Sequence, residues 1–192
     1  MQPLIGVLAL QGDFAAHRLA ITAEGARAIE VRTAQDLASC DGLILPGGES
    51  TTMLRLLNVE GLFEALRLYG QQRPIYGTCA GVILLATQVS NPQQASLGLF
   101  DIHVERNAYG RQIDSHIATL DCAHGSLEAV FIRAPIIRSV GPGVNVVSVH
   151  RGTPVWVDDG RHMITTFHPE LTRDRTAHRA FLARVRDTTG RS

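Results

Sequence analysis

The sequence of 192 residues contains no lysine, so all 18 of its basic residues are arginines. Without a lysine amine, no side chain of this chain can form an imine with a carbonyl compound. The same absence excludes the Gly-x-x-x-x-Gly-Lys loop that binds nucleotide phosphates. Imine catalysis and that type of nucleotide binding are therefore excluded.

Cysteine is scarce, and no charge of either sign is in excess. The three cysteines, Cys40, Cys79 and Cys122, are too irregularly spaced for a disulfide framework or a set of paired metal ligands. The net charge is zero, which gives no basic surface for nucleic acid or for an anionic membrane. No apolar run approaches the roughly 20 residues that span a bilayer, and the N-terminus lacks a signal-peptide pattern. We expect a cytoplasmic chain with reduced thiols, no metal, and no nucleic-acid or membrane partner.

The residues that are present predict one α/β domain over 1–192. Hydrophobic residues make up 45% of the chain and charged residues 19%, as in ordinary globular proteins. In the first half, short apolar runs alternate with helical patterns, which indicates βαβ units around a mainly parallel sheet. Strands are predicted at 4–10, 28–32, 42–45 and 74–77, and helices from Asp13 and at 51–58, 61–71 and 82–87.

The second half is richer in strands and ends in a helix. Strand patterns lie at 100–105, 116–121, 129–133 and 144–150, followed by a hairpin of 155–157 and 163–167 and by an amphipathic helix over 172–187. The whole pattern predicts a three-layer sandwich of flavodoxin-like plan. Such folds place their sites at the carboxyl ends of the parallel strands.

The segment Gly77-Thr78-Cys79-Ala80-Gly81 lies between a predicted strand and a predicted helix. This is the form of a nucleophile elbow, a sharp turn that presents one reactive side chain at the edge of the sheet. A cysteine at a helix N-terminus is favoured as the nucleophilic thiolate, and the backbone N–H of Ala80 is placed to bind an oxyanion. An arbitrary cysteine is more often a buried structural residue, and Cys40 and Cys122 keep that interpretation.

A second segment, His168-Pro169-Glu170, directly follows a predicted strand. Proline keeps the preceding residue extended, so His168 and Glu170 can project to similar sides. A base and an orienting carboxylate complete a Cys-His-acid triad. By itself the motif is weak, since a lone histidine is more often structural; its pairing with the Cys79 elbow is what favours catalysis.

The third segment is Leu45-Pro46-Gly47-Gly48-Glu49-Ser50-Thr51-Thr52, at the end of a buried strand. Paired glycines allow the backbone to approach a ligand, and the N–H of Gly48 is a candidate second oxyanion donor. The alternative is a tight turn that ends in a helix capped by Ser50.

With these segments in view, the chain resembles the class I, triad-type glutamine amidotransferases, and within them the glutaminase subunits of pyridoxal 5'-phosphate synthase. The resemblance rests on six blocks in the family's order: LQG at 10–12, GLILPGGESTTM at 42–53, GTCAG at 77–81, VERNAYGRQ at 104–112, VFIRAP at 130–135 and FHPELT at 167–172.

The resemblance implies hydrolysis of L-glutamine to glutamate and ammonia. Cys79 would form a glutamyl thioester, His168 would move the protons, and Glu170 would orient His168. No cofactor is expected. The residues implied to surround the glutamine are Gly47, Gly48, Glu49, Arg106, Ile132 and Arg133.

The resemblance also implies a partner, a barrel-shaped synthase subunit that uses the ammonia to build pyridoxal 5'-phosphate. The Gln11-Gly12 region and the first helix are the expected docking elements. Other interpretations remain open: a glutaminase for a different synthase, a hydrolase of γ-glutamyl peptides, a redox-sensing or chaperone-like protein with a reactive cysteine, and a purely structural module.

Overall fold

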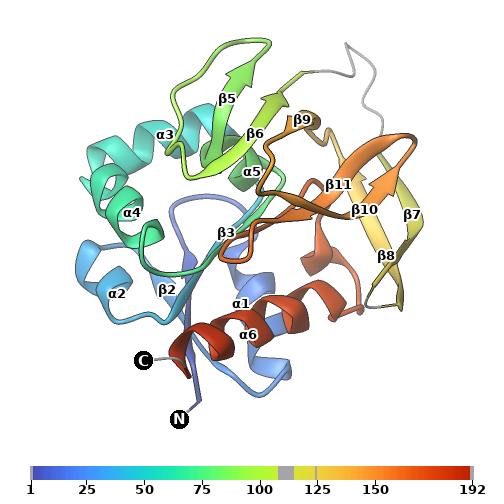
Figure 1. The fold of residues 1–192 in the computed structure, drawn as a ribbon. Coiled ribbons are helices and arrows are strands. Elements are labelled where there is room, and N and C mark those ends of the chain that lie inside the picture. Colours follow the sequence, from blue (N-terminus) through green and yellow to red (C-terminus); the bar gives the residue numbers. More distant parts are fainter. Residues whose placement is uncertain (1, 108–114, 124, 191–192) are drawn as a thin grey trace.

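A computed structural model describes residues 2–107, 115–123 and 125–190, so the last part of the 104–112 block lies outside the described residues (Figure 1). Short strands alternate with helices up to residue 90, and strands dominate from residue 100 until the final helix. The described elements are β1 (Leu4–Leu8), α1 (Phe14–Ala23), β2 (Arg27–Val31), α2 (Ala34–Ala38), β3 (Gly42–Leu45), α3 (Ser50–Val59), α4 (Leu62–Gly70), β4 (Ile75–Thr78), α5 (Ala80–Leu85), β5 (Ala86–Ser90), β6 (Phe100–Glu105), β7 (Ser115–Cys122), β8 (Gly125–Ile132), β9 (Ile136–Val140), β10 (Asn145–His150), β11 (Thr153–Asp158), β12 (Met163–Thr165), the 3-10 turn η1 (Pro169–Leu171) and α6 (Thr176–Thr189).

Seven of the described strands form the central sheet, in the order β10-β11-β12-β4-β3-β1-β2. The strands β2, β1, β3, β4 and β12 run parallel, and β11 and β10 extend the sheet in antiparallel pairing. Numbered among themselves, the parallel strands have the order 2-1-3-4-5, which is that of flavodoxin-like folds. The predicted three-layer, mainly parallel fold is confirmed.

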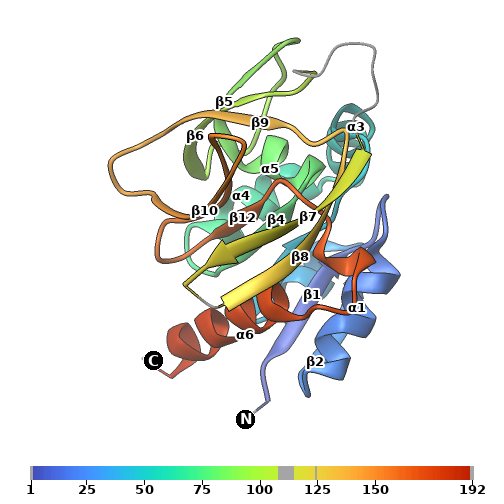
Figure 2. The ribbon, with the colours of Figure 1, turned by 90° about the vertical axis from the view of Figure 1, so that its right-hand side faces the viewer.

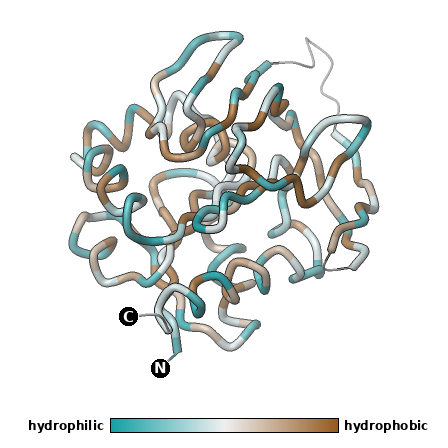
Figure 3. The backbone as a smooth tube through the Cα atoms, viewed as in Figure 1, coloured by the Kyte–Doolittle hydropathy of each residue, from teal (hydrophilic) through white to brown (hydrophobic). Residues whose placement is uncertain are grey.

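Two hydrophobic clusters cover the two faces of this sheet. One joins apolar side chains of α2, α3, α4 and α5 with β5, β6 and β9. The other joins α1 and α6 with the β7–β8 hairpin, which forms a separate two-stranded sheet (Figure 2). Hydrophobic residues follow the central strands, while polar residues gather on the loops around them (Figure 3). Burial on both faces explains why β3 and β4 appear in the sequence as continuous apolar runs.

The small sheet β5-β6-β9 differs most from the sequence prediction. The helix predicted over 82–87 ends at Leu85, and β5 follows directly, while β9 was not predicted. Residues 86–90 alternate only partly between buried and exposed positions. Pairing with β6, a tertiary interaction, therefore decides their conformation.

The last helix also begins later than predicted, at Thr176 and not at Thr172. Pro169–Leu171 form a 3-10 turn, and the Asp174 carboxylate then accepts the backbone N–H of Thr176 at 2.7 Å. This hydrogen bond satisfies one of the free donors of the first helical turn. The 3-10 turn leaves Glu170 buried beside the end of β12, where the site lies.

A buried histidine connects the start of β4 to the turn before β12. The Nδ1 atom of His162 accepts the backbone N–H of Ile75 at 3.1 Å. Burial, against the opposing attraction of Asp159, lowers the pKa of His162 to about 4. Protonation at Nδ1 would remove the acceptor that Ile75 uses.

We expect acid to destabilise the protein through His162. An unfolded histidine takes up its proton near pH 6.5, whereas folded His162 does so only near pH 4. Because the unfolded chain binds more protons between these values, stability is lost as the pH falls from about 6.5 to about 4, by on the order of 3 kcal/mol.

The variant His162→Asn keeps an acceptor for Ile75 but cannot titrate. The free energy of unfolding can be measured with urea at about pH 7.5 and at about pH 4.5. Between these values it should fall by about 3 kcal/mol less in the variant than in the unsubstituted protein. The same loss in both proteins would contradict the assignment.

Candidate active site

Cys79 lies on the predicted elbow, between the end of β4 and the start of α5. Its φ of 46° and ψ of −102° are strained values for a residue other than glycine. The strain is held in place by its neighbours: the backbone N–H of Cys79 donates to the carbonyl of Thr165 on β12 at 3.0 Å. A side-chain carbon at Gly81 would lie 2.3 Å from the carbonyl oxygen of Leu45, so α5 can approach β3 only because residue 81 is glycine. These contacts hold the elbow and its thiol in one position.

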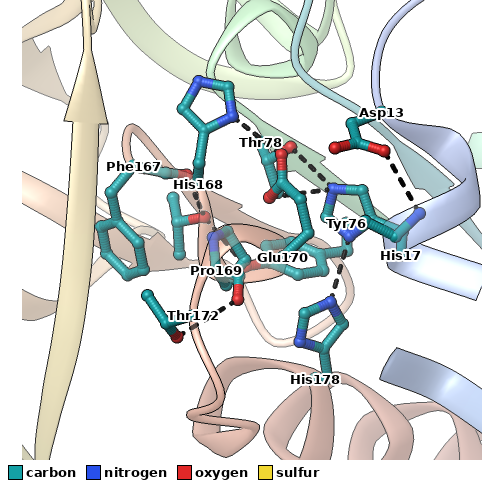
Figure 4. Close-up of polar contacts among 12 residues, drawn as sticks. Asp13, His17, Tyr76, Thr78, Phe167, His168, Pro169, Glu170, Thr172 and His178 are labelled. Atoms are coloured by element: carbon teal, nitrogen blue, oxygen red, sulfur yellow. Dashed lines mark hydrogen bonds and ion pairs between the residues drawn. The ribbon is translucent and has the colours of Figure 1, made fainter. Parts of the chain in front are cut away.

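His168 and Glu170 are brought together after β12 as predicted (Figure 4). The Nδ1 atom of His168 lies 2.8 Å from Oε1 of Glu170. The backbone N–H of His168 donates to the carbonyl of Val130 on β8 at 2.8 Å, which fixes the chain at this point. The opposite ring nitrogen is Nε2, and His168 and Cys79 line the same pocket.

The electrostatics of this group favour an ion pair. Burial opposes the charge of His168, but hydrogen bonds and attraction from Cys79 and Glu170 outweigh it and raise the pKa of His168 to about 10. Burial likewise opposes the charge of Glu170, yet attraction to His17 and the hydrogen bond from His168 lower the pKa of Glu170 below its ordinary value. Near neutral pH these directions correspond to an imidazolium held against a carboxylate.

The Gly47-Gly48 turn packs directly against His168 and Cys79. A side-chain carbon at Gly47 would lie 2.4 Å from Cε1 of His168 and 3.4 Å from Cβ of Cys79. Only a glycine leaves room there for the imidazole ring. The Gly-Gly motif is thus explained by a close approach between backbone and side chain.

The alternative of a Ser50 helix cap is wrong in one detail, since Glu49 is the capping residue of α3. Its carboxylate accepts the backbone N–H groups of Thr51 at 3.1 Å and Thr52 at 2.7 Å. Burial opposes the charge of Glu49, but these bonds and the one from the Thr52 hydroxyl lower its pKa to about 2. Ser50 is the first helical residue and donates its hydroxyl to Gln94 at 3.0 Å.

A pocket of about 340 Å³ opens above the thiol. It brings together side chains and backbone from six separate segments of the chain. Its lining includes Gln11, Gly48, Glu49, Cys79, Ala80, Arg106, Ile132, Arg133 and His168. Every predicted site residue lines this pocket except Gly47 and Glu170. The backbone of Gly47 packs against the ring of His168, and Glu170 is hydrogen-bonded to that ring. A larger groove of about 720 Å³ between α6 and the β11–β12 hairpin contains none of these groups.

Arg106 is the best-placed cation in the pocket. Its guanidinium donates to the Thr51 hydroxyl at 2.8 Å and lies 3.5 Å from a Glu49 oxygen, with 11% of its side chain exposed. Arg133 is exposed at the end of β8 with a φ of 45°. The carbonyl oxygen of Ile132 lies 3.9 Å from Sγ of Cys79.

Two functional candidates, His17 and His178, were not found from sequence, and Gln11 was expected only as part of the docking region. The side-chain oxygen of Gln11 accepts the backbone N–H of Glu49 at 3.1 Å and so holds the turn beside the pocket. His17 and His178 are buried behind Glu170. His17 shares the buried face of α1 with Ala20 and Ile21, so helical periodicity gave a signal for its burial but none for its partner.

Two further observations concern the described parts of the chain. There, no three His, Cys, Asp or Glu side chains gather in a way that suits a metal ion. No helix in those parts has the length and apolar character needed to cross a bilayer.

Comparisons with known proteins point in one direction. Residues 7–187 match the model of the SNO glutamine amidotransferase family. A protein of Solibacter usitatus named pyridoxal 5'-phosphate synthase subunit PdxT is 52% identical over 189 residues, covering 94% of this chain and 98% of the relative. A protein of the same name from Shouchella clausii is 51% identical over 184 residues, covering 94% of each. A crystal structure of a glutamine amidotransferase superimposes with a TM-score of 0.89 at 43% identity, covering 94% of this chain and 98% of that one.

Proposed function

Because the chain belongs to the SNO glutamine amidotransferase family, we propose that it hydrolyses L-glutamine and delivers the ammonia to a synthase that makes pyridoxal 5'-phosphate. The curated relatives are named as subunits of that synthase. The absence of lysine agrees with a division of labour in which any imine chemistry takes place on the other subunit.

One observation carries the chemical part of this proposal. The strained Cys79 elbow and the His168–Glu170 pair come from distant parts of the chain, yet Cys79 and His168 line the same pocket. A thiol, a base and an orienting carboxylate in this arrangement are the elements of covalent amide hydrolysis.

The reaction follows from the order of these groups. The Cys79 thiolate attacks the side-chain amide carbon of glutamine, and a tetrahedral oxyanion forms. The imidazolium of His168 then gives its proton to the leaving nitrogen, so that ammonia departs and a glutamyl thioester remains. His168 next removes a proton from water, whose oxygen attacks the thioester carbon; glutamate leaves and Cys79 is restored.

The walls of the pocket have separate roles in this scheme. The backbone N–H groups of Ala80 and Gly48 are the proposed oxyanion donors, and Ala80 begins α5, where backbone donors have no helical acceptor. Gly47, Glu49, Ile132 and Arg133 complete the glutamine site. The guanidinium of Arg106 is the proposed partner of the substrate α-carboxylate, because its planar fork can donate two parallel hydrogen bonds.

We place the synthase subunit, expected to be a barrel, against the face formed by the Gln11-Gly12 region and α1, in the cytoplasm. Two large apolar side chains are exposed there, Leu19 on α1 at 65% and Leu171 on η1 at 44%. The elements α1 and η1, which carry these side chains, contact each other. Gln11 would connect docking to the pocket through its hydrogen bond to Glu49.

The test is glutamate release from L-glutamine by the purified chain, alone and with the cognate synthase subunit. We expect the synthase to increase the rate, because docking at Gln11 orders the Gly48-Glu49 turn. The variant Cys79→Ala serves as the blank and should release no glutamate in either mixture. Glutamate release by Cys79→Ala, or none by the unsubstituted complex, would overturn the proposal.

A further inference from the structure

A pair of histidines lies buried behind the proposed triad and has no role in the scheme above. His17 comes from α1 and His178 from α6, and each is 0% exposed. Burying two ionisable rings in a hydrophobic core is costly unless each ring is hydrogen-bonded. Their contacts show what they do there.

The two rings continue the row of contacting side chains that begins with His168 and Glu170. Nε2 of His17 lies 3.2 Å from Oε2 of Glu170, the oxygen that His168 does not use. Nδ1 of His17 lies 3.0 Å from Nε2 of His178. Figure 4 shows the resulting row, His168, Glu170, His17 and His178; His168 lines the pocket, and His178 belongs to α6.

Hydrogen-bond chemistry fixes the direction of each bond. A carboxylate oxygen only accepts, so a hydrogen bond from His17 to Glu170 needs the proton on Nε2, the nitrogen that the Thr78 hydroxyl also approaches at 3.4 Å. In the described part of the chain, Nδ1 of His178 is buried without a hydrogen-bond partner. In a buried site, an unpaired acceptor nitrogen costs less free energy than an unpaired N–H donor does. His178 therefore carries its proton on Nε2 and donates to Nδ1 of His17.

The surroundings of His178 support this assignment. Burial is the largest cause that holds the pKa of His178 well below its ordinary value, so this ring is uncharged. Its ring meets the edge of Tyr76 at a centroid distance of 6.3 Å. If His178 is uncharged and carries its proton on Nε2, then Nδ1 of His17 accepts that proton's hydrogen bond, and the proton of His17 lies on Nε2.

From this geometry we propose that His17 is a positioning residue: it holds the second oxygen of Glu170, and His178 fixes the tautomer with which it does so. The inference rests on the proposed glutaminase chemistry. Oε2 of Glu170 is buried and has no hydrogen-bond partner among the described residues, so an N–H of His17, 3.2 Å away, is the donor that would hold the carboxylate and keep Oε1 aligned with Nδ1 of His168. The base is then aligned with Cys79 before the substrate arrives.

Two amides of different length test the donor directly. The side-chain amide of His17→Gln reaches the position of Nε2 and restores a donor to Glu170, whereas His17→Asn has the same amide one methylene shorter. With the synthase present, we expect His17→Gln to stay within about threefold of the original kcat. We expect His17→Asn to lose up to about 100-fold in kcat at unchanged KM.

A double substitution tests whether His17 affects kcat only through Glu170. In a Glu170→Gln background, adding His17→Asn should change kcat by less than about twofold, because His17 acts only through the carboxylate. His162→Asn, which substitutes another buried histidine outside this row, is the control for general destabilisation and should retain its kcat. Nitrogen-15 spectra of the imidazoles should show both His17 and His178 protonated on Nε2.

The outcomes separate this inference from the proposed function. If Cys79→Ala is inactive but His17→Asn retains full kcat, only the positioning role fails. Equal losses for His17→Asn and His17→Gln, a full additional loss in the Glu170→Gln background, or a proton on Nδ1 of His178 would also overturn it.

Discussion

Replacing His168 by asparagine should lower kcat for glutamine hydrolysis by about 10⁴-fold or more. In the proposed mechanism the ring links two groups: Nδ1 bonds to Glu170 at 2.8 Å, and the opposite nitrogen exchanges protons with the groups at Cys79. Asparagine is too short to serve both at once. Without the imidazole, the leaving nitrogen receives no proton and the thioester meets no activated water.

The measurement is glutamate release by the complex with the synthase, with glutamine binding followed by calorimetry. Binding should persist, because His168 forms only one wall of the pocket. A matched control is His103→Asn on β6, whose Nε2 bonds to the Ser90 hydroxyl at 2.8 Å outside the site. Retention of more than about a tenth of kcat by His168→Asn would contradict the role of general acid and base.

The placement of Cys79, His168 and Glu170 was predictable because it is encoded locally. A strand followed by Gly-x-Cys-x-Gly and a helix can hardly form anything but an elbow, and proline sets the direction of His168. Parallel strands bring their carboxyl ends to one edge, so β4 and β12 had to place Cys79 and His168 together. Short-range constraints and a simple topology were sufficient.

What escaped prediction depends on contacts between distant segments. His17 and His178 are separated by 161 positions in sequence, and neither has a local motif. The capping role of Glu49 was missed for a different reason: Glu49 and Ser50 are adjacent, and only the observed hydrogen bonds show which of them precedes the first helical turn. Likewise, the strand character of β5 depends on β6, which begins after an intervening loop.

The absolute requirement for glycine at position 81 gives the second large expectation. In Gly81→Ala, the new methyl carbon would lie 2.3 Å from the carbonyl oxygen of Leu45 and 3.0 Å from its Cβ. Both contacts are with the end of β3, where no flexible side chain can move aside. The first turn of α5 must shift away, and it takes Ala80 and Cys79 with it.

We expect the free energy of unfolding to fall by roughly 1–3 kcal/mol, as is typical of overpacked cores. Activity should fall further than stability, because a displacement of about 1 Å at a reacting group can cost about 100-fold in rate. Circular dichroism during urea unfolding gives the first quantity, and glutamate release with the synthase gives the second. Gly143→Ala is the matched control: no atom lies within 4 Å of its added carbon, so both quantities should hardly change. If Gly81→Ala lost stability but kept its rate per folded molecule, the thiol would not need the rigid elbow, and the strain at Cys79 would have no part in catalysis.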